Sequence, residues 1–381
     1  MDPHVSTPGP QRGTRSAPLT SGSGPGADPD AAIASLVDPT RAGPVEWSDH
    51  DGDHLAQAAA AHRVLGPALL TVVESGADEP ALTEALLHRL RGAMAWCLEL
   101  ELRLLEIAEW FDDAGGVEFL VLKGPAVAHL DEIDPSLRSF ADLDLLVHAR
   151  DMDRAIAALD RHGARRRIPQ QRPGFDRRYS KGVGTQCGDG MEIDVHRTLC
   201  VGALGLRIPL DDLFARADSF EIGGRRFSAL CLEHRALHAA YHAVVGSPTP
   251  ALHTVRDLAQ YLQRPELRPA VLTAEAKRWG GLTVLADAVR VTAETFGGLP
   301  SSWTAWLSGV RPDPGDLALI AASRAESSWP IEMSVLRALR WRERPGYVWA
   351  EVWPSAAVLT DRGQTRWSRL RDGIGAVRRS R

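Results

Sequence analysis

The sequence predicts an α+β protein in which a small mixed sheet is flanked by N-terminal and C-terminal helical regions. Three observations support this fold class. Apolar residues recur at helical spacing from residue 54 to 110, short β-branched and aromatic runs follow up to residue 230, and helical spacing returns beyond Cys231. We therefore expect five parts: a disordered leader (1–45), an N-terminal helical region (46–115), an α/β core (116–230), a C-terminal helical region (231–365) and a basic tail (366–381).

The composition is that of an ordinary soluble protein. The 381 residues contain 44% hydrophobic residues and carry a formal net charge of only −5, so the total charge gives no general attraction to nucleic acid. There is no apolar stretch of about 20 residues and no signal-peptide pattern. The four cysteines lack metal-binding spacing. We expect a cytoplasmic protein with reduced thiols and no membrane contact.

The leader and the first helical region differ in composition. Residues 1–44 are rich in Pro, Gly, Ser, Thr, Ala and Asp, which bury too little apolar surface to offset the entropy of the chain. Residues 54–110 predict about three amphipathic helices, with breaks near Gly66-Pro67 and at residues 76–80. The last of these helices is predicted from the spacing of the apolar residues Leu86, Leu87, Leu90, Met94, Cys97, Leu98, Leu102 and Leu105.

The predicted core alternates strands and helices. Residues 117–122 read as a buried strand, and Pro125 follows as the first residue of a short helix to about residue 130. A second strand spans 141–148, and a helix over 152–162 ends at Gly163. A third strand spans 191–196, and residues 226–230 predict a short fourth.

Asp142 and Asp144 are the first candidate catalytic residues. They stand two residues apart on a predicted strand, so their side chains leave the same face with Cα atoms roughly 7 Å apart. Leu143 and Leu145 point to the core. Two carboxylates plus substrate phosphates suit Mg²⁺, which prefers oxygen ligands. A strand end with two solvated acids remains the alternative for so short a pattern.

The third strand carries the next candidate carboxylates. Glu192 and Asp194 share one face, while Ile193 and Val195 are expected to be buried on the other. One of the two acids can complete a two-metal site if this strand lies beside the second, and we favour Asp194. A half-buried strand with a polar outer face is the alternative.

Lys123 and Gly124 form a turn between the first strand and a helix. Free backbone N–H groups at a helix N-terminus favour a phosphate, and glycine permits its close approach. Lys123 is equally compatible with a surface lysine.

The order of these elements resembles that of the polymerase-beta nucleotidyltransferase superfamily. In detail, Leu122-Lys123-Gly124, Arg138, the run 142–147 and Asp194-Val195-His196 resemble an uncharacterised bacterial nucleotidyltransferase family, family 5, over roughly residues 54–354. The resemblance implies a polymerase-beta-type core sheet. It also implies transfer of a nucleoside monophosphate from a nucleoside triphosphate, expected to be ATP, with release of pyrophosphate. The acceptor would be a hydroxyl or similar group on a small molecule, peptide or protein, and nucleic acid is not an expected partner.

The same resemblance assigns roles to individual residues. It implies that Asp142, Asp144 and Asp194 hold Mg²⁺ or Mn²⁺ and form the catalytic site. Lys123 and Gly124 would bind the nucleotide phosphates. The remaining nucleotide-binding residues are expected to be Arg138, facing the phosphates, and His238, beside the pocket.

Several other features allow two interpretations. His234, His238 and His242 form one stripe on a helix, and we expect them to pack beside the nucleotide pocket in preference to binding zinc. The basic run 165–181 is expected to be a solvated loop, with a mobile lid over the triphosphate as the alternative. The Trp-rich segments beyond residue 300 are expected in the core. A non-catalytic binder of nucleotide or protein with the same fold is the second functional hypothesis, and a metal-dependent phosphohydrolase is the third.

Overall fold

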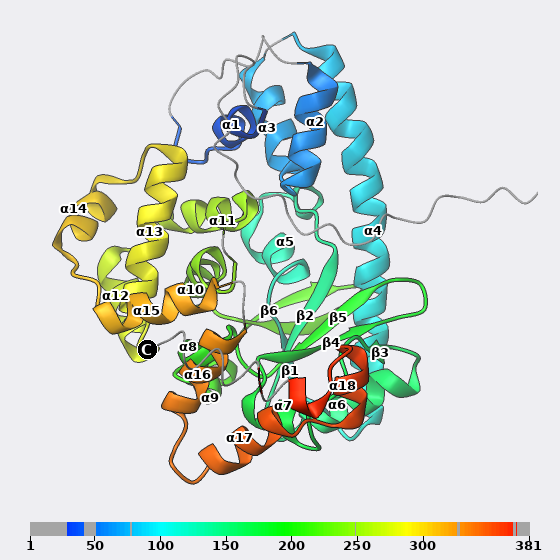
Figure 1. The fold of residues 1–381 in the computed structure, drawn as a ribbon. Helices are drawn as coiled ribbons and strands as arrows, with labels where there is room; N and C mark the ends of the chain where they lie inside the picture. Colours follow the sequence, from blue (N-terminus) through cyan, green and yellow to red (C-terminus); the bar gives the residue numbers. More distant parts are fainter. Residues whose placement is uncertain are drawn as a thin grey trace, which may run out of the picture.

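One mixed seven-stranded sheet lies at the centre of the computed structural model, which describes residues 29–41, 51–76, 78–247, 249–325, 328–368 and 371 (Figure 1). The strands are β1 (Phe119–Val121), β2 (Asp142–Val147), β3 (Arg165–Arg166), β4 (Gly182–Gln186), β5 (Glu192–His196), β6 (Asp218–Ile222) and β7 (Arg225–Ala229). Their order across the sheet is β3-β4-β5-β2-β1-β7-β6. β2 pairs with β5, and β1 with β7, in parallel, while the other neighbours are antiparallel. The predicted α+β class with a mixed sheet is confirmed.

The two faces of the sheet are buried against different helices. Side chains alternate along β2, so Leu143 and Leu145 pack with one helical layer, while Leu146 joins a core shared with the C-terminal helices. Asp142 and Asp144 have the same parity as Leu146. The acids of β2 therefore lie on the face turned toward the C-terminal helical region.

The N-terminal helices cap one end of the molecule. They are α1 (Pro29–Leu36), α2 (Gly52–Ala61) and α3 (Leu65–Ser75). The predicted disordered leader is wrong for residues 29–41, because α1 buries Ile33 and Leu36, which are 0% and 1% exposed. Composition averaged over the segment hid this short apolar stripe. The rest of the predicted leader, residues 1–28 and 42–45, lies outside the described residues.

The predicted break at Gly66-Pro67 lies three residues earlier. Both residues fall in the first turn of α3, where proline is tolerated because its missing N–H has no helical partner. The chain instead turns at residues 62–64, where Arg63 has a positive φ of 57°.

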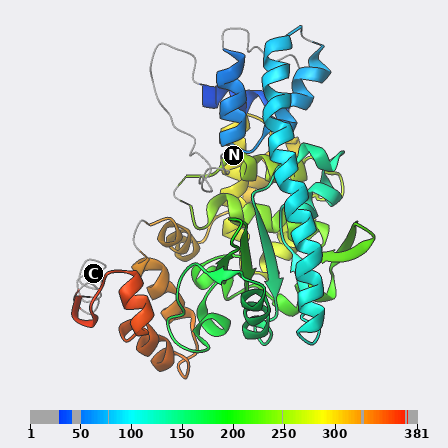
Figure 2. The ribbon, with the colours of Figure 1, turned by 90° about the vertical axis from the view of Figure 1, so that its right-hand side faces the viewer.

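Helix α4 (Pro80–Asp113) joins the N-terminal helices to the sheet (Figure 1 and Figure 2). Its first part packs into the helical core through Leu86, and its second part packs on the sheet through Leu100 and Leu104. The predicted apolar face is wrong at two positions: Leu98 and Leu102 are 58% and 63% exposed. The buried stripe passes through residues 97, 100, 104 and 107 and leaves them on the solvent side.

Short helices connect the strands. They are α5 (Pro125–Asp131), the 3₁₀ helix η1 (Pro135–Leu137), α6 (Met152–Arg161), α7 (Phe175–Tyr179), α8 (Gly202–Gly205) and α9 (Leu210–Ala215). The two helices predicted in this region are confirmed. α5 begins at Pro125. Gly163, two residues after the end of α6, has a positive φ of 89° and ends the helical segment. Part of the basic run forms β3 and α7, so the prediction of a solvated loop there is wrong for those residues.

The C-terminal region is helical, as predicted. Its helices are α10 (Leu232–Val244), α11 (Leu252–Leu262), α12 (Pro269–Arg278), α13 (Leu282–Phe296), α14 (Ser301–Gly309), α15 (Pro314–Ser323), α16 (Trp329–Ala338), α17 (Arg344–Val352) and α18 (Ala356–Asp361). Trp303 is buried as expected, but Trp341 and Trp349 are 73% and 56% exposed, so a core role is wrong for them. Arg172 lies over the ring of Trp349 and covers part of it. Most of the predicted tail, residues 369–370 and 372–381, lies outside the described residues.

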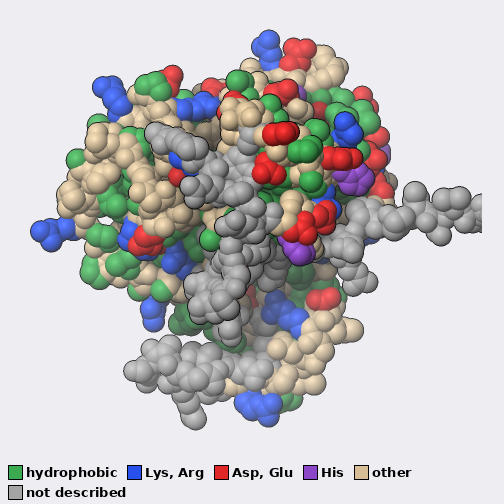
Figure 3. Space-filling view, turned by 90° about the horizontal axis from the view of Figure 1, so that it is seen from above, with side chains coloured by type: hydrophobic (Ala, Val, Ile, Leu, Met, Phe, Trp, Pro, Cys, Tyr) green, Lys and Arg blue, Asp and Glu red, His purple; other side chains and the backbone are tan. Residues whose placement is uncertain are grey.

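The surface carries charges of both signs. Seen from above, acidic and basic side chains are interspersed over the visible described residues, without one broad surface of a single sign (Figure 3). No helix in the described part of the chain combines the length and apolar character needed to cross a membrane.

Candidate active site

The carboxylates of β2 and β5 lie side by side. In the parallel pairing, Asp144 is directly opposite Asp194, and Asp142 is opposite Glu192. Both strands therefore present their acids to the same face, as the alternation of side chains predicts. Ile193 is fully buried on the other face. The register turns two separate sequence motifs into one carboxylate cluster.

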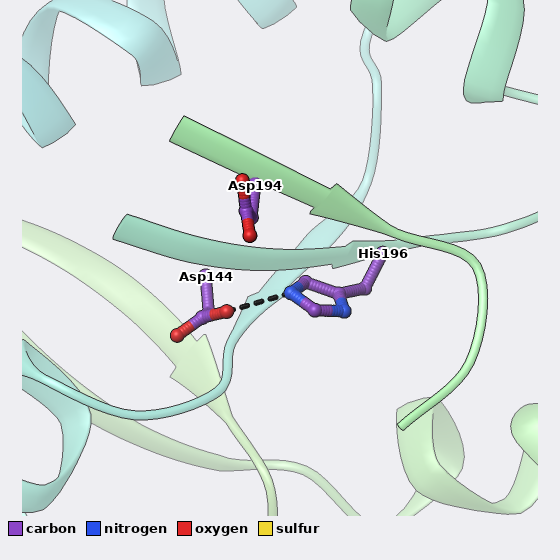
Figure 4. Close-up of side chains that lie close together, drawn as sticks. All are labelled: Asp144, Asp194 and His196. Atoms are coloured by element: carbon purple, nitrogen blue, oxygen red, sulfur yellow. Dashed lines mark hydrogen bonds and ion pairs between the residues drawn. The ribbon is translucent and has the colours of Figure 1, made fainter. Parts of the chain in front are cut away.

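Asp144 is the most enclosed member of the cluster, with 5% exposure. Lys123 Nζ lies 2.8 Å from its Oδ2, and His196 Nε2 lies 2.6 Å from its Oδ1. Figure 4 shows Asp144 and His196 turned toward each other from neighbouring strands, with Asp194 beside them. Burial favours the neutral acid, but the Lys123 ammonium and the hydrogen bond from His196 outweigh it and hold the pKa of Asp144 well below its usual value.

Asp194 is held by an arginine that the sequence did not single out. Arg167 Nη2 donates to Asp194 Oδ1 at 2.7 Å, and its Nη1 donates to Glu192 Oε2 at 2.6 Å. Arg167 follows β3, and its backbone N–H bonds to the carbonyl of Gly184 on β4. The basic run therefore reaches the carboxylate cluster through Arg167.

Asp142 lies at the edge of the same cluster. Burial and the neighbouring charge of Asp144 raise the pKa of Asp142 to about 6, against the opposing effects of Lys123 and Arg63. Asp142 does not belong to the tightest group of donors, which consists of Asp144, Asp194 and His196.

The turn before α5 requires glycine. Gly124 has φ of 46° and ψ of −110°, and a Cβ atom there would lie 3.2 to 3.4 Å from atoms of the Phe140 side chain. Lys123 precedes this turn and reaches across to Asp144. The glycine thus allows the chain to bring a lysine and a helix N-terminus together beside the carboxylates.

We expect Gly124→Ala to destabilise the protein by about 1–3 kcal/mol, because it combines an unfavourable backbone conformation with a close side-chain contact. Chemical denaturation of the variant measures this change. Gly92→Ala is the matched control, because Gly92 lies inside α4 with open space at the Cβ position. A Gly124→Ala variant as stable as the parent would contradict the strain assigned to this turn.

Lys181 and two histidines of α10 also lie near the cluster. Lys181 immediately precedes β4, and its pKa is lowered by burial and by Lys123. His238 and His242 lie on α10, and Lys123 contributes to lowering the pKa of both. His238 and His242 thus lie near Lys123, whereas His234 lies beside Asp212 and Glu275. Among the described donors, neither His238 nor His242 belongs to a group close enough to share a metal.

Arg138 precedes β2 by four residues and is paired within the protein. Both of its terminal nitrogens bond the carboxylate of Asp257 on α11, and its residue exposure is 8%. In this conformation Arg138 joins the segment before β2 to the C-terminal helices. The pair with Asp257 uses two of the five N–H donors of the guanidinium, and Arg138 Nε is buried without a hydrogen-bond partner, so the pair does not occupy every donor.

Buried histidines predict that stability falls as the pH falls below about 6.5, the usual pKa of histidine. Burial is the main cause that lowers the pKa of His196, His234, His238 and His253, the last to about 3. Between these values and 6.5 the unfolded chain binds more protons than the folded protein, so acid favours unfolding. Burial raises the pKa of Asp142 and of Asp176, which acts in the opposite direction, but the histidines with lowered pKa values outnumber these two carboxyl groups. Calorimetry from pH 8 to pH 5 should show a falling melting temperature, and a constant or rising one would contradict this balance.

The residues present fit a hard divalent cation. Asp144, Asp194 and His196 each place a donor atom within 4.8 Å of the others. Lys123 neutralises the charge of Asp144, and Arg167 neutralises that of Asp194. A bound divalent cation would neutralise the same two charges. Oxygen donors suit Mg²⁺ and Mn²⁺, and one imidazole is compatible with Mn²⁺.

Sequence reasoning missed several residues of the site. His196 has the same parity as Asp194 on β5, so the period of the strand was a usable signal for it. Arg167 and Lys181 stood within the basic run, which gave no means of selecting them. Arg63 lies far away in sequence, and only the tertiary fold brings it near Asp142.

Comparisons with known proteins relate the chain to a family of nucleotidyltransferases. A family model described as an uncharacterised nucleotidyltransferase matches residues 48–297. No curated protein matches the chain. Among solved structures, the chain is similar to an antigenic nucleotidyltransferase-like protein from Paracoccidioides brasiliensis, with 15% sequence identity and a TM-score of 0.34, covering 57% of this chain and 95% of that chain. The segment matched by the family model contains every residue of the site described above.

Proposed function

Because the chain belongs to this family of uncharacterised nucleotidyltransferases, we propose that it transfers a nucleoside monophosphate from a nucleoside triphosphate to an acceptor and releases pyrophosphate. ATP is the proposed nucleotide, and the acceptor is a hydroxyl or similar group on a small molecule, peptide or protein. Mg²⁺ or Mn²⁺ is the proposed cofactor, bound by Asp142, Asp144 and Asp194.

One observation carries this proposal. Asp144 and Asp194 occupy directly opposed positions on neighbouring parallel strands, with Lys123 of the glycine turn in contact with Asp144. Carboxylates for a metal and cations for a triphosphate are therefore adjacent. Phosphoryl-group chemistry needs these two functions within one site, because catalysis depends mainly on positioning and on neutralising charge.

The carboxylates serve first as ligands. When bound, a divalent ion supplies a Lewis acid that activates an acceptor hydroxyl and neutralises phosphate charge. Asp144 is ionised at neutral pH because its pKa is lowered, so it needs no deprotonation before it binds a cation. His196 fixes the orientation of this carboxylate through its 2.6 Å hydrogen bond.

The cations beside the carboxylates are proposed to receive the triphosphate. Lys123 can turn from Asp144 to a phosphate oxygen, and the backbone N–H of Gly124 lies at the same turn. Lys181 supplies a further positive charge near Lys123. Charge grows on pyrophosphate as it leaves, so these groups favour the transition state over the bound substrate.

Asp194 is proposed to meet the acceptor. Arg167 now holds Asp194 Oδ1, but its side chain is 36% exposed and can move toward an incoming anion. Asp194 would then be free to orient the acceptor hydroxyl and to take its proton. His238 is proposed to line the nucleotide-binding side, and Arg138 to reach the phosphates.

Lys123→Met is expected to reduce kcat/KM for the nucleotide by about 10- to 100-fold, which corresponds to about 1.4–2.7 kcal/mol of transition-state binding. The change removes the charge while keeping most of the length of the side chain. Steady-state kinetics with varied nucleotide measure it. Lys277→Met is the matched control, because Lys277 is exposed at the end of α12. Equal effects of the two changes would contradict a phosphate contact by Lys123.

The experiment that tests the function is a screen for pyrophosphate release. Each of the four ribonucleoside triphosphates is incubated with Mg²⁺, protein and fractionated cell extract, and acceptors are identified by mass spectrometry. Acceptor-dependent release, a nucleotide-mass adduct and loss of both in Asp194→Asn would support the proposal. Nucleotide binding with neither release nor adduct would favour a non-catalytic binder of the same fold.

A further inference from the structure

A second group of metal-binding side chains lies among α9, α10 and α12 and shares no residue with the carboxylate cluster. Asp212, His234 and Glu275 each place a donor atom within 4.8 Å of the others. We propose that these three residues bind a zinc ion, with a fourth position left for water. The site would join three helices on the C-terminal side of the sheet.

The distances suit tetrahedral zinc. His234 Nε2 lies 3.4 Å from Glu275 Oε2 and 3.6 Å from Asp212 Oδ2. Zinc bonds of about 2.1 Å in tetrahedral geometry place neighbouring donor atoms about 3.4 Å apart. Only small side-chain movements are therefore needed to bind the ion.

Two buried oxygens point to a ligand at this position. Asp212 Oδ2 and Glu275 Oε2 are buried without a hydrogen-bond partner, and both lie near His234 Nε2. The other oxygen of each carboxylate is paired: Arg278 lies 2.8 Å from Asp212 Oδ1, and Arg216 lies 2.7 Å from Glu275 Oε1. A buried carboxylate oxygen without a hydrogen bond is costly, and a metal ion would satisfy both of the oxygens that face His234.

His234 is prepared to act as a neutral ligand. Its residue exposure is 0%, and Glu275 is 9% exposed, so the group is largely shielded from water. Arg216 Nη1 lies 3.4 Å from His234 Nε2 and disfavours a charged ring, and neutral imidazole is the form that binds zinc. His234 Nδ1, the ring nitrogen that would face away from the ion, has no hydrogen-bond partner, so no second hydrogen bond fixes the orientation of the ring. We therefore expect an exchangeable ion that is bound less tightly than in a fully supported site.

Arg216 is the competing cation. Its Nη1 lies 3.4 Å from His234 Nε2 and 3.7 Å from Asp212 Oδ2, so in this conformation it occupies part of the space beside the donors. The Arg216 side chain is 33% exposed and can turn outward. If the cluster serves only to hold Arg216, substitution of Arg216 destabilises the protein and creates no affinity for metal. If the cluster binds zinc, substitution of Arg216 tightens zinc binding.

The test uses the full chain carrying Asp144→Asn and Asp194→Asn, so that the first carboxylate cluster does not take up the ion. Zn²⁺ is titrated by calorimetry, and Co²⁺ is followed by its visible absorption. One equivalent bound, with the strong absorption of tetrahedral Co²⁺, is expected. Adding Asp212→Asn should abolish both signals, and adding Arg216→Gln should lower the zinc dissociation constant several-fold.

Two results would overturn the site. The first is unchanged Zn²⁺ binding after Asp212→Asn, which would place the ion elsewhere, for example on the other histidines of α10. The second is no bound Zn²⁺ or Co²⁺ in either the parent or Arg216→Gln. Asp212 is partly exposed and the change to asparagine keeps its shape, so the variant is expected to fold, and circular dichroism checks this. His234→Ala provides an independent loss of the nitrogen ligand.

Discussion

Asp144→Asn is expected to lower kcat by about 1,000-fold or more, which corresponds to about 4 kcal/mol of lost transition-state stabilisation. Asp144 is the carboxylate that meets both Lys123 and His196, and it lies directly opposite Asp194. Asparagine keeps the shape but removes the charge that a divalent cation and the ammonium group require. Single-turnover kinetics with saturating nucleotide measure the chemical step.

Glu192→Gln is the matched control for this prediction. Glu192 lies on the same face of β5 as Asp194 and also pairs with Arg167, but it lies outside the tight group of donors. We expect activity within a few-fold of the parent. The assignment of Asp194 over Glu192 would be contradicted if Glu192→Gln were as damaging as Asp144→Asn. Calorimetry gives the folded fraction of each variant at the assay temperature, because Asp144→Asn also removes the buried partner of Lys123 and is expected to lower the melting temperature.

The second large effect is on stability. Asp131→Ala is expected to destabilise the protein by about 3–5 kcal/mol, because it removes a buried carboxylate that several groups share and leaves Asp218 as the remaining carboxylate partner of buried Arg235. Asp131 accepts from Arg235 Nε at 2.8 Å and from the Tyr261 hydroxyl at 2.5 Å, and Arg264 lies 3.2 Å from it. The side chains of Asp131 and Arg235 are 2% and 4% exposed. This network ties the end of α5 to α10 and α11 and thereby supports the glycine turn.

Denaturant titration of Asp131→Ala measures the loss. The control is Asp53→Ala, which removes an exposed ion pair with Arg89 of 2.8 Å length. An exposed ion pair contributes about 0–1 kcal/mol, so its removal should change the free energy of unfolding very little. If both changes cost the same, the buried network would not be the main link between α5 and the C-terminal helices.

Local patterns in the sequence were sufficient for the central strands and the main acids. Asp142, Asp144 and Asp194 alternate with apolar residues, and this period of two predicts both the strand and the face that carries the acids. The turn at Gly124 and the helix beginning at Pro125 are likewise marked by residues with special backbone preferences. In each case the information lies within a few neighbouring residues.

The strands that were missed carry weak local signals. β4 contains Gly182 and Gly184, which are disfavoured in strands, and it became a strand because it pairs with β5. A Cβ atom at Gly182 would lie 2.6 Å from the carbonyl oxygen of Val195, and glycine therefore permits this close pairing. These residues form a strand because they pair with β5, and their local sequence does not predict it.

The pairs that complete the site join residues that lie far apart in the sequence and meet only in the folded protein. Arg167 meets Asp194 across 27 residues, and Arg138 meets Asp257 across 119. Nothing in the sequence specified which arginine of the basic run faces the carboxylates, nor that Arg138 would be engaged by α11. These contacts follow from the order of strands in the sheet and from the packing of the C-terminal helices upon it.

The most direct test of nucleotidyl transfer follows two isotopic labels through one reaction. The protein is incubated with Mg²⁺, an acceptor and nucleoside triphosphate labelled at either the α- or the γ-phosphorus. The account predicts that the α-label appears on the acceptor and the γ-label in pyrophosphate, with both products absent for Asp144→Asn. Appearance of the γ-label on the acceptor, or its release as inorganic phosphate alone, would contradict nucleotidyl transfer and show a different phosphoryl chemistry at these carboxylates.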